Sequence, residues 1–357
     1  VIIMLLDKDT KTVDGEYFEY LITTDDQVSL LLRRFKVSGS NNPVLCIHGW
    51  TSSGNMFYQR EIDHFVGYCH RHGYDDVWVL ENRLSCIFDY NQQDIYNLDD
   101  VAQYDYQPAL DEIEKQTGQL NIHIISHCVG ALTFCMSLSA GYLSNYVDQI
   151  KSLTCNCVSI VPNIKPWAKI KLSFGPEIFK YLTPIKYMDP QWAIKPGFSL
   201  GKLLANIVAI GHPETNNKVC SMLSFIWGSG RPALYNLENI KPETYQRLGE
   251  LLGVAGFTNF IHLRKMVNCG EMVSWQGKRI IEGFKSVDIP LFLMTGADNN
   301  VFYNSQQKSF DRLNELRPNG DQTLKVFENY GHQDPFCGQF AHRDIFPSIV
   351  EFMNRFE

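Results

Sequence analysis

The chain has 357 residues, a length that suits either two folding units or one large unit that carries an insertion. With 45% hydrophobic and 20% charged residues it can form a sizeable core, which excludes a largely disordered protein. Its 32 Lys and Arg residues and 39 Asp and Glu residues give a net charge of −7, so broad attraction to nucleic acid or to an anionic membrane is not expected.

Ten cysteines are scattered along the chain without any CxxC pair, which argues against a zinc-binding or thioredoxin-like site. A chain of this size does not need disulfide bonds, so we interpret them as free thiols of a reducing compartment and expect a cytoplasmic protein. The apolar run at 1–6 is too short for a signal peptide or a membrane span. We expect no integral membrane segment, metal or cofactor, while the first residue, Val1, leaves fusion to or association with another domain open.

The first half of the chain alternates short apolar runs with helical patterns. The predicted strands are 17–24, 28–35, 43–47, 76–80, 121–125 and 158–161, and the predicted helices are 57–72, 98–116 and 128–140. The first two strands flank a polar turn and form a hairpin. The rest of the alternation predicts an α/β protein with a mostly parallel sheet and helices on both faces.

This alternation stops near residue 162 and resumes near residue 288. The intervening segment is helical, irregular and rich in aromatic residues, so we predict a core of 1–161 and 288–357 interrupted by a helical lid at 162–287. Within the lid, 199–210 predicts an amphipathic helix whose apolar face is too broad for open solvent. The second part of the core contains predicted strands at 289–295 and 324–328, with helices at 305–316 and from about 344.

Cys128 lies in a sharp turn between a predicted strand and a helix of small residues. The sequence Ser126-His127-Cys128-Val129-Gly130 has the spacing of a nucleophile elbow, in which the positions two before and two after the nucleophile are small. A thiol at a helix N-terminus is favoured as thiolate by the helix dipole. The alternative is a core cysteine at a helix start.

A second candidate element, His48-Gly49-Trp50, directly follows a buried strand. In elbow hydrolases the loop after this strand and the residue after the nucleophile supply the oxyanion-hole amides, which would here be those of Trp50 and Val129. We assign His48, Gly49 and His127 to the substrate pocket, although an ordinary turn glycine or a packed histidine would also fit this sequence.

The acid and the base of a triad are predicted after the last two strands. Asp298 follows the penultimate strand and His332 follows the last, which is the order nucleophile, acid, base of elbow hydrolases. Asp334 is two residues after His332, so we expect it to anchor the loop rather than to orient the imidazole. We therefore predict a triad of Cys128, His332 and Asp298.

These spaced motifs resemble the α/β-hydrolase superfamily along nearly the whole chain. The order of its early motifs is similar to that of acid lipases, and a closer resemblance is to the hydrolase-like domain found with some cholesterol-oxidase-like (GMC) flavoproteins. The matching segments are 73–78, 100–105, 126–130, 252–255, 331–334 and 343–347. The resemblance implies an α/β-hydrolase fold and a Cys-His-Asp triad, with Cys in the place that Ser has in acid lipases. The sequence has no GxGxxG, so no flavin-binding half is expected.

Together these features predict a hydrolase of carboxylic esters or thioesters that acts through an acyl intermediate on Cys128. The lid would supply an apolar acyl pocket, and the substrate would be a small-molecule acyl ester or thioester. Two alternatives remain open. One is an acyltransferase that uses the same acyl-enzyme, and the other is a catalytically degenerate hydrolase fold used as a binding module.

Overall fold

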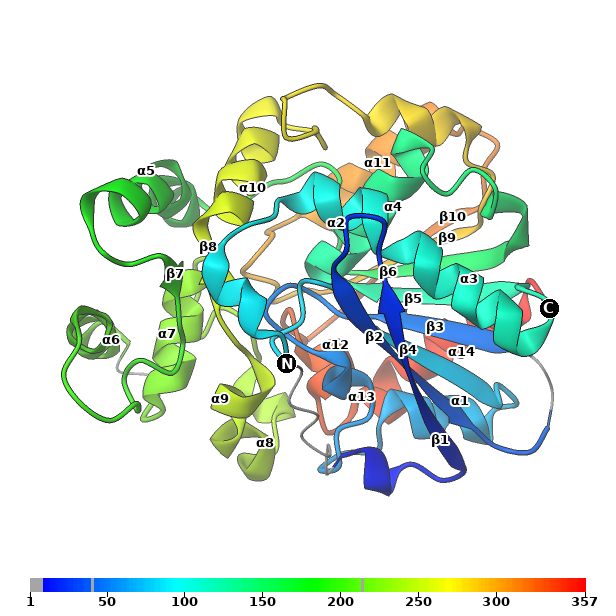
Figure 1. Cartoon of the computed structure of the whole chain (residues 1–357), viewed down its shortest axis with the longest axis horizontal. Helices are drawn as coiled ribbons and strands as arrows, with labels where there is room; N and C mark the ends of the chain where they lie inside the picture. The colour runs from blue at the N-terminus through cyan, green and yellow to red at the C-terminus, as the bar shows by residue number, and fades with distance from the viewer. Residues whose placement is uncertain (1–8, 40–41, 213–214) are drawn as a thin grey trace.

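The computed structural model describes residues 9–39, 42–212 and 215–357, so the apolar run at 1–6 lies outside the described residues. An eight-stranded sheet crosses the molecule in the order β1-β2-β4-β3-β5-β6-β9-β10 (Figure 1). No helix in the described ranges is long and apolar enough to cross a membrane.

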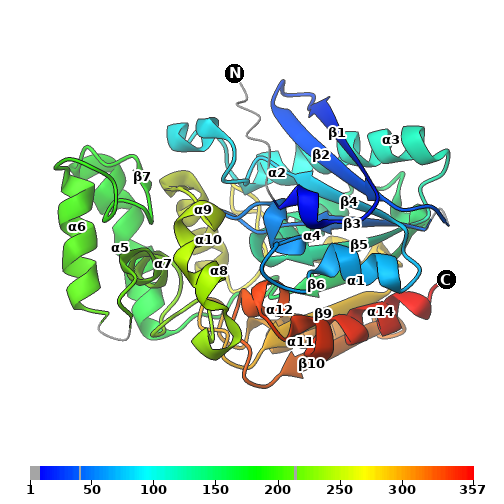
Figure 2. The same cartoon turned by 90° about the horizontal axis from the view of Figure 1, so that it is seen from below.

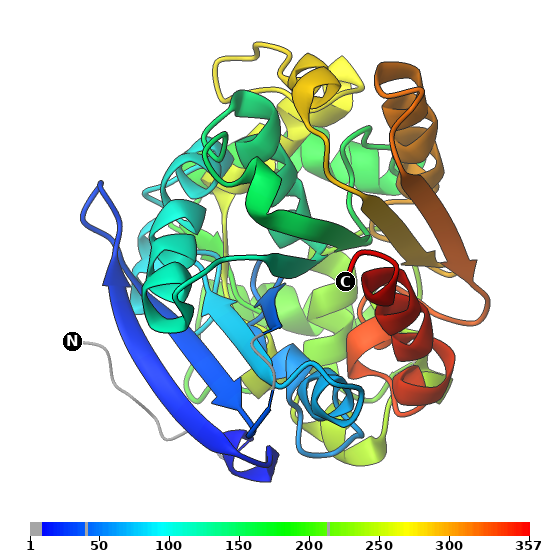
Figure 3. The same cartoon turned by 90° about the vertical axis from the view of Figure 1, so that its right-hand side faces the viewer.

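The sheet is mostly parallel, as predicted. The hairpin of β1 and β2 forms one edge and β2 pairs antiparallel with β4, whereas all pairs from β4 to β10 are parallel (Figure 3). The central strands β3 and β5 are buried along their whole length, which is typical of parallel strands covered on both faces. The strands are β1 (Glu16–Thr23), β2 (Ser29–Lys36), β3 (Pro43–Ile47), β4 (Asp76–Glu81), β5 (Ile122–His127), β6 (Ile150–Asn156), β9 (Leu291–Gly296) and β10 (Gln322–Phe327).

Helices cover both faces of this sheet. On one face α1 packs against α14, and on the other α2 packs against α4. The helices of the core are α1 (Phe65–Arg71), α2 (Leu98–Tyr104), α3 (Tyr106–Thr117), α4 (Cys128–Ala140), α11 (Ser305–Leu316), α12 (Asp334–Cys337), α13 (Ala341–Asp344) and α14 (Phe346–Asn354).

The segment between β6 and β9 is mainly helical. Figure 2 shows α5, α6 and α7 in a lobe at the end of the molecule opposite the C-terminus. The elements of this segment are α5 (Pro166–Leu182), β7 (Tyr187–Met188), α6 (Leu200–Ile210), α7 (Lys218–Ile226), α8 (Pro242–Gln246), α9 (Leu248–Leu251), β8 (Ala255–Gly256) and α10 (Phe257–Cys269). We refer to residues 162–287 as the insertion.

Three predicted elements are wrong in part. The helix predicted at 57–72 is only α1, because the chain before it is irregular and His64 accepts a hydrogen bond from Gly67 N as the N-cap. The helix predicted at 98–116 is divided at Asp105 into α2 and α3, because Pro108 has no N–H to donate to a carbonyl in the preceding turn.

The strand predicted at 158–161 is the third error, since the strand in this position is β6, Ile150–Asn156. Its alternate residues Ser152, Thr154 and Asn156 are polar but buried, so its sequence lacks the apolar run by which the other parallel strands were found. The chain leaves the sheet at Cys157, whose φ of 55° ends the extended conformation.

Candidate active site

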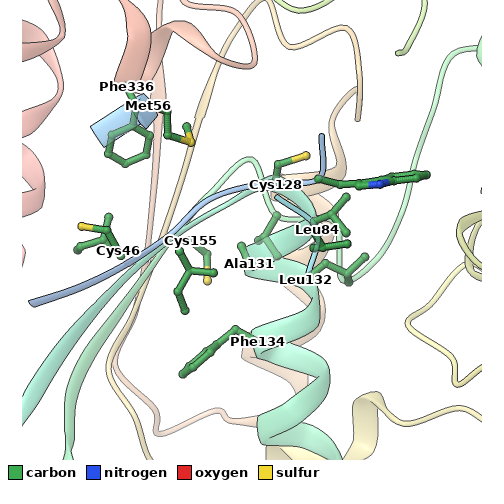
Figure 4. Close-up of a cluster of buried hydrophobic side chains, with 14 of the residues drawn as sticks. Cys46, Met56, Leu84, Cys128, Ala131, Leu132, Phe134, Cys155 and Phe336 are labelled. Atoms are coloured by element: carbon green, nitrogen blue, oxygen red, sulfur yellow. The ribbon is translucent and has the colours of Figure 1, made fainter. Parts of the chain in front are cut away.

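Cys128 lies at the turn from β5 into α4, and its backbone adopts a left-handed conformation with φ 54°. This conformation is strained for any residue with a side chain, and strain of this kind is concentrated at functional sites. The loop after β3 packs directly on the turn. A Cβ on Gly130 would overlap the carbonyl oxygen of His48, and one on Gly49 would lie 2.9 Å from the Cβ of Cys128. Figure 4 shows Cys128 at the end of α4, above the packed core.

His332 follows β10 and lies beside the thiol. The Sγ of Cys128 and one potential ligand atom from each of His127 and His332 all lie within 4.8 Å of one another. The backbone N of His332 donates to the carbonyl of Leu234 at 2.9 Å, so the insertion helps to hold the histidine loop. Cys128 is only 7% exposed and His332 only 1%, so the pair is shielded from bulk water.

Asn299 is the residue that orients His332. Its Oδ1 lies 3.1 Å from His332 Nδ1 and also accepts from the backbone N of Val301 at 3.1 Å and of Phe302 at 3.3 Å. Because two backbone donors identify this atom as the oxygen, Nδ1 of His332 must carry the proton. The unprotonated Nε2 is then the nitrogen available as a base. The Nδ2 of Asn299 donates to Thr295 Oγ1 at 3.2 Å and completes the support.

Asp298 therefore does not have the place predicted for it. Its side chain is exposed, and the turn after β9 directs the next side chain, that of Asn299, toward the imidazole. The sequence signal was present in the run Asp298-Asn299, because an amide oxygen can fix a histidine tautomer as a carboxylate does. A carboxylate is the usual orienting group of a triad, so the sequence pattern favoured Asp298 over Asn299.

Asp334 is buried and anchors the loop that carries His332. Its Oδ2 accepts hydrogen bonds from Gly331 N at 2.7 Å, Asn236 N at 3.1 Å and Asn239 Nδ2 at 3.1 Å. These bonds join the histidine loop to the insertion. Burial is the largest influence on this carboxyl and raises the pKa of Asp334 to about 6.

Burial also controls the charge of Cys128 and His332. It raises the pKa of the Cys128 thiol, an effect that neighbouring Cys157 strengthens and the amide of Val129 opposes. Burial lowers the pKa of His332 to about 3. Both directions favour a neutral thiol beside a neutral imidazole, in contrast to the thiolate that the helix dipole alone would favour. Asn299 adds no negative charge that would stabilise an imidazolium.

The residues assigned to the oxyanion hole lie around the same turn. Val129 is in the first turn of α4, where a backbone N–H has no partner within the helix, so its amide can serve an oxyanion. The Trp50 ring is buried against Trp227 and Phe260, with centroids 5.1 and 4.8 Å away. The role of the Trp50 amide stays a prediction.

His48 does not face the substrate side as expected. Its Nε2 lies 3.3 Å from Glu81 Oε2, and Glu81 also pairs with the buried Arg33. Its Nδ1 lies 2.7 Å from the carbonyl oxygen of Gly49. The imidazole turns inward because this buried carboxylate attracts it, so His48 positions the loop after β3.

His127 turns one nitrogen toward the site. Asn156 Nδ2 lies 2.8 Å from His127 Nδ1, and the Cys157 thiol contacts Asn156 Oδ1 at 3.3 Å. In this arrangement Asn156 donates to Nδ1, which leaves the His127 proton on Nε2. Nε2 is buried and has no hydrogen-bond partner in the described part of the chain, so it is available as a donor.

The three groups around the turn also satisfy the distance criterion for a metal site. Within the described ranges, His127, Cys128 and His332 are the one cluster with atoms close enough to hold an ion. Two imidazoles and a thiolate would suit a soft divalent cation such as zinc. Such an ion would occupy the nucleophile and the base, so the metal and the thiol chemistry exclude each other.

A cavity of about 320 Å³ lies beside this site, inside the insertion. It is lined by apolar residues of α5, α7 and α10, together with Val301 and Phe302. Phe302 lies 6.3 Å from the ring of His332, and Trp227, also in the lining, lies 5.1 Å from Trp50. Cys128 is not among the residues that line the cavity.

No family model matches the chain, and no curated protein has a significantly similar sequence. Many solved structures are similar. They include the monoacylglycerol lipase of Paleococcus ferrophilus, with 12% identity, coverage of 92% of this chain and 100% of the lipase, and a TM-score of 0.55. The epoxide hydrolase VrEH1 of Vigna radiata is 15% identical over 96% of this chain and 99% of its own, with a TM-score of 0.56.

The chain has the α/β-hydrolase fold. The esterase PF2001 of Pyrococcus furiosus, 16% identical over 96% of this chain and 92% of its own with a TM-score of 0.51, is a further example. At these identities the similarity extends to the fold alone. In an α/β-hydrolase fold the turn after the central strand carries the nucleophile, and this is the position of Cys128.

We expect Asn299→Ala to lower kcat for a p-nitrophenyl ester by about 10- to 1,000-fold, because His332 loses the acceptor that fixes its tautomer. The matched change Asp298→Ala should leave kcat within about threefold of wild type. Steady-state kinetics on both variants, with melting curves as the control for folding, test the assignment. Loss of activity in Asp298→Ala with retention in Asn299→Ala would restore the aspartate as the orienting group.

Alkylation of Cys128 by iodoacetamide should accelerate as the pH is raised from about 6 to about 9, because burial keeps the thiol protonated at neutral pH. A pre-formed thiolate would instead react at a rate that is already constant over this range. Peptide mass spectrometry at each pH measures the rate at this cysteine, and a flat profile would contradict the neutral pair.

Two substitutions of Asp334 distinguish the effect of its hydrogen bonds on stability from the effect of its charge. Asp334→Ala removes the acceptor of three bonds and should lower the free energy of unfolding by roughly 2–4 kcal/mol. Asp334→Asn keeps an acceptor oxygen and should be about as stable as wild type at neutral pH. Because the pKa of Asp334 is raised in the folded state, its contribution to the free energy of unfolding is greatest below about pH 4. This contribution falls as the pH rises through about 6. Urea unfolding at several pH values tests both points, and an unstable Asp334→Asn would show that the charge itself is required.

Proposed function

We propose that this protein hydrolyses carboxylic esters or thioesters through an acyl intermediate on Cys128. The observation that carries the proposal is the strained elbow that places the thiol beside His332, whose other nitrogen is fixed by Asn299. A strained turn, a base and an orienting group meet at one point, which is the requirement for an activated nucleophile.

The reaction begins with proton transfer from Cys128 Sγ to His332 Nε2 as the sulfur attacks the carbonyl carbon. The carbonyl electron pair moves to the oxygen, which the amides of Val129 and Trp50 stabilise. Collapse of this intermediate breaks the bond to the leaving alcohol or thiol, which takes the proton from His332. The product of this half-reaction is an acyl thioester on Cys128.

Deacylation repeats these steps with water as the nucleophile. His332 takes a proton from the water as its oxygen attacks the thioester, and returns it to Sγ as the carboxylic acid leaves. The free Nε2–H of His127 is suited to donate to the substrate oxygen, in agreement with the assignment of this residue to the substrate pocket.

An apolar acyl chain is the substrate group that the cavity in the insertion fits best. Its lining has one cation, Lys171, whose Nζ donates to the carbonyl of Phe225 at 2.5 Å. Cys128 does not line the cavity, so we expect side chains between them to move before an acyl chain bound there can reach the thiol.

Intact mass spectrometry with p-nitrophenyl esters of increasing chain length tests this function directly. We expect an adduct of one acyl mass on Cys128, with kcat/KM rising by up to about fourfold per methylene until the cavity is filled. Cys128→Ala should give no adduct, and Cys128→Ser should lose at least about 100-fold in turnover because a hydroxyl is harder to deprotonate.

The remaining alternatives give different results in the same assay. Faster release of p-nitrophenol with added alcohols or thiols, together with formation of new esters, would identify an acyltransferase. Absence of both adduct and turnover with every ester, in a protein that melts cooperatively, would identify a degenerate binding module and overturn the proposal.

A further inference from the structure

Two helices of the insertion expose apolar faces to solvent. On α5, Phe174 is 64% and Leu182 78% exposed, and on α6, Ile207 is 58% and Ile210 82% exposed. Both helices lie in the lobe at the end of the molecule opposite the C-terminus (Figures 1 and 2). The large hydrophobic residues exposed on α5 are Trp167, Ile170, Phe174, Ile178, Tyr181 and Leu182, and those exposed on α6 are Leu200, Leu203, Ile207 and Ile210.

These residues follow the helical period rather than scattering over the surface. They recur at intervals of three and four on both helices, so each helix presents an apolar stripe along its length. The broad apolar face predicted for 199–210 was expected to be covered, but the structure buries only part of it, including Ala205 and Val208, and leaves the rest open. Phe198, immediately before the N-cap of α6, is 89% exposed and extends the apolar surface.

The same part of the chain is basic, although the whole protein is acidic. Residues 162–227 contain eight lysines and no arginine against three carboxylates, those of Glu177, Asp189 and Glu214, whereas the whole chain has a net charge of −7. Lys169 and Lys186 are exposed in this lobe. The lobe and the core therefore carry charge excesses of opposite sign.

The apolar stripe of α5 is continuous with the cavity beside the active site. Trp167, Ile170 and Phe174 line the cavity and are each more than half exposed. An apolar molecule that reaches this face of α5 would thus already be at the edge of the cavity.

We propose that the α5–α6 lobe docks on the surface of an anionic lipid bilayer. The exposed side chains would lie at the boundary between headgroups and acyl chains, while lysines contact lipid phosphates and the acidic core is repelled into solvent. The charge excess argues for lipid rather than for a second copy of the chain, because two lobes of the same sign would repel each other. Delivery of an acyl substrate from the bilayer into the cavity rests on the proposed function, whereas docking itself does not.

Sedimentation with vesicles tests the docking. Vesicles of phosphatidylcholine containing about one-third phosphatidylglycerol should bind the full chain, and vesicles of phosphatidylcholine alone should bind it at least about tenfold less. Ile207→Ser combined with Ile210→Ser should weaken binding to the anionic vesicles by about tenfold or more. Lys169→Glu combined with Lys186→Glu should do the same, and added salt should weaken the wild type.

Matched changes on the core are the controls. Leu21→Ser with Ile95→Ser removes side chains that are 63% and 65% exposed outside the insertion, and Lys11→Glu with Lys325→Glu reverses exposed lysines there. Both control variants should bind vesicles as wild type does. None of the four α6 or lysine changes touches the cavity lining, so hydrolysis of a short soluble ester should be unchanged in them.

The proposal would be overturned by equal binding to neutral and anionic vesicles. It would also be overturned if the α6 and lysine variants bound as well as the core controls. A dimer in lipid-free solution that Ile207→Ser with Ile210→Ser dissociates would also overturn it, in favour of self-association. Loss of ester turnover with retained vesicle binding would contradict the proposed function alone, so the two hypotheses fail separately.

Discussion

The close approach of two backbones at Cys128 is the constraint on which the site depends. The loop after β3 lies so near the start of α4 that Gly130 has no room for a Cβ beside the carbonyl of His48. In the same contact, Gly49 lies against Cys128, whose backbone has a left-handed conformation. A side chain at either glycine would separate strand from helix and move the thiol from the base.

On the side of the loop after β3 that faces the core, the buried carboxylate of Glu81 pairs with Arg33 and contacts His48. Glu81 keeps a pKa of about 2 in spite of its burial, because Arg33 and His48 surround it and Ser85 donates to it. Above the loop, burial raises the pKa of the Cys128 thiol and lowers that of His332, so both groups favour their neutral forms. In the proposed reaction, charge would therefore develop at the site only when a proton moves from Cys128 to His332.

The insertion performs two tasks with different surfaces. Its inner residues, Leu234 and Asn239, bind the loop that carries His332, so removal of the insertion would disturb the base as well as the cavity. Its outer helices α5 and α6 present apolar residues and lysines to the outside. A net charge for the whole chain hides this division, because the acidic core outweighs the basic lobe.

The sequence by itself determined the alternation of strands and helices, its interruption by a helical segment, and the positions of Cys128 and His332. These features depend on the periodicity of hydrophobic residues and on small residues at a sharp turn, which are local properties of the sequence. Strand β6 was not predicted, because the burial of its polar residues becomes evident only when their partners in the folded structure are known. The orienting group was decided by tertiary structure alone: Asp298 and Asn299 are neighbours in sequence, and the turn after β9 selects which one faces the imidazole. Tertiary structure also decided the charge state of the thiol and the exposure of α6, because burial depends on what the rest of the chain places around a residue.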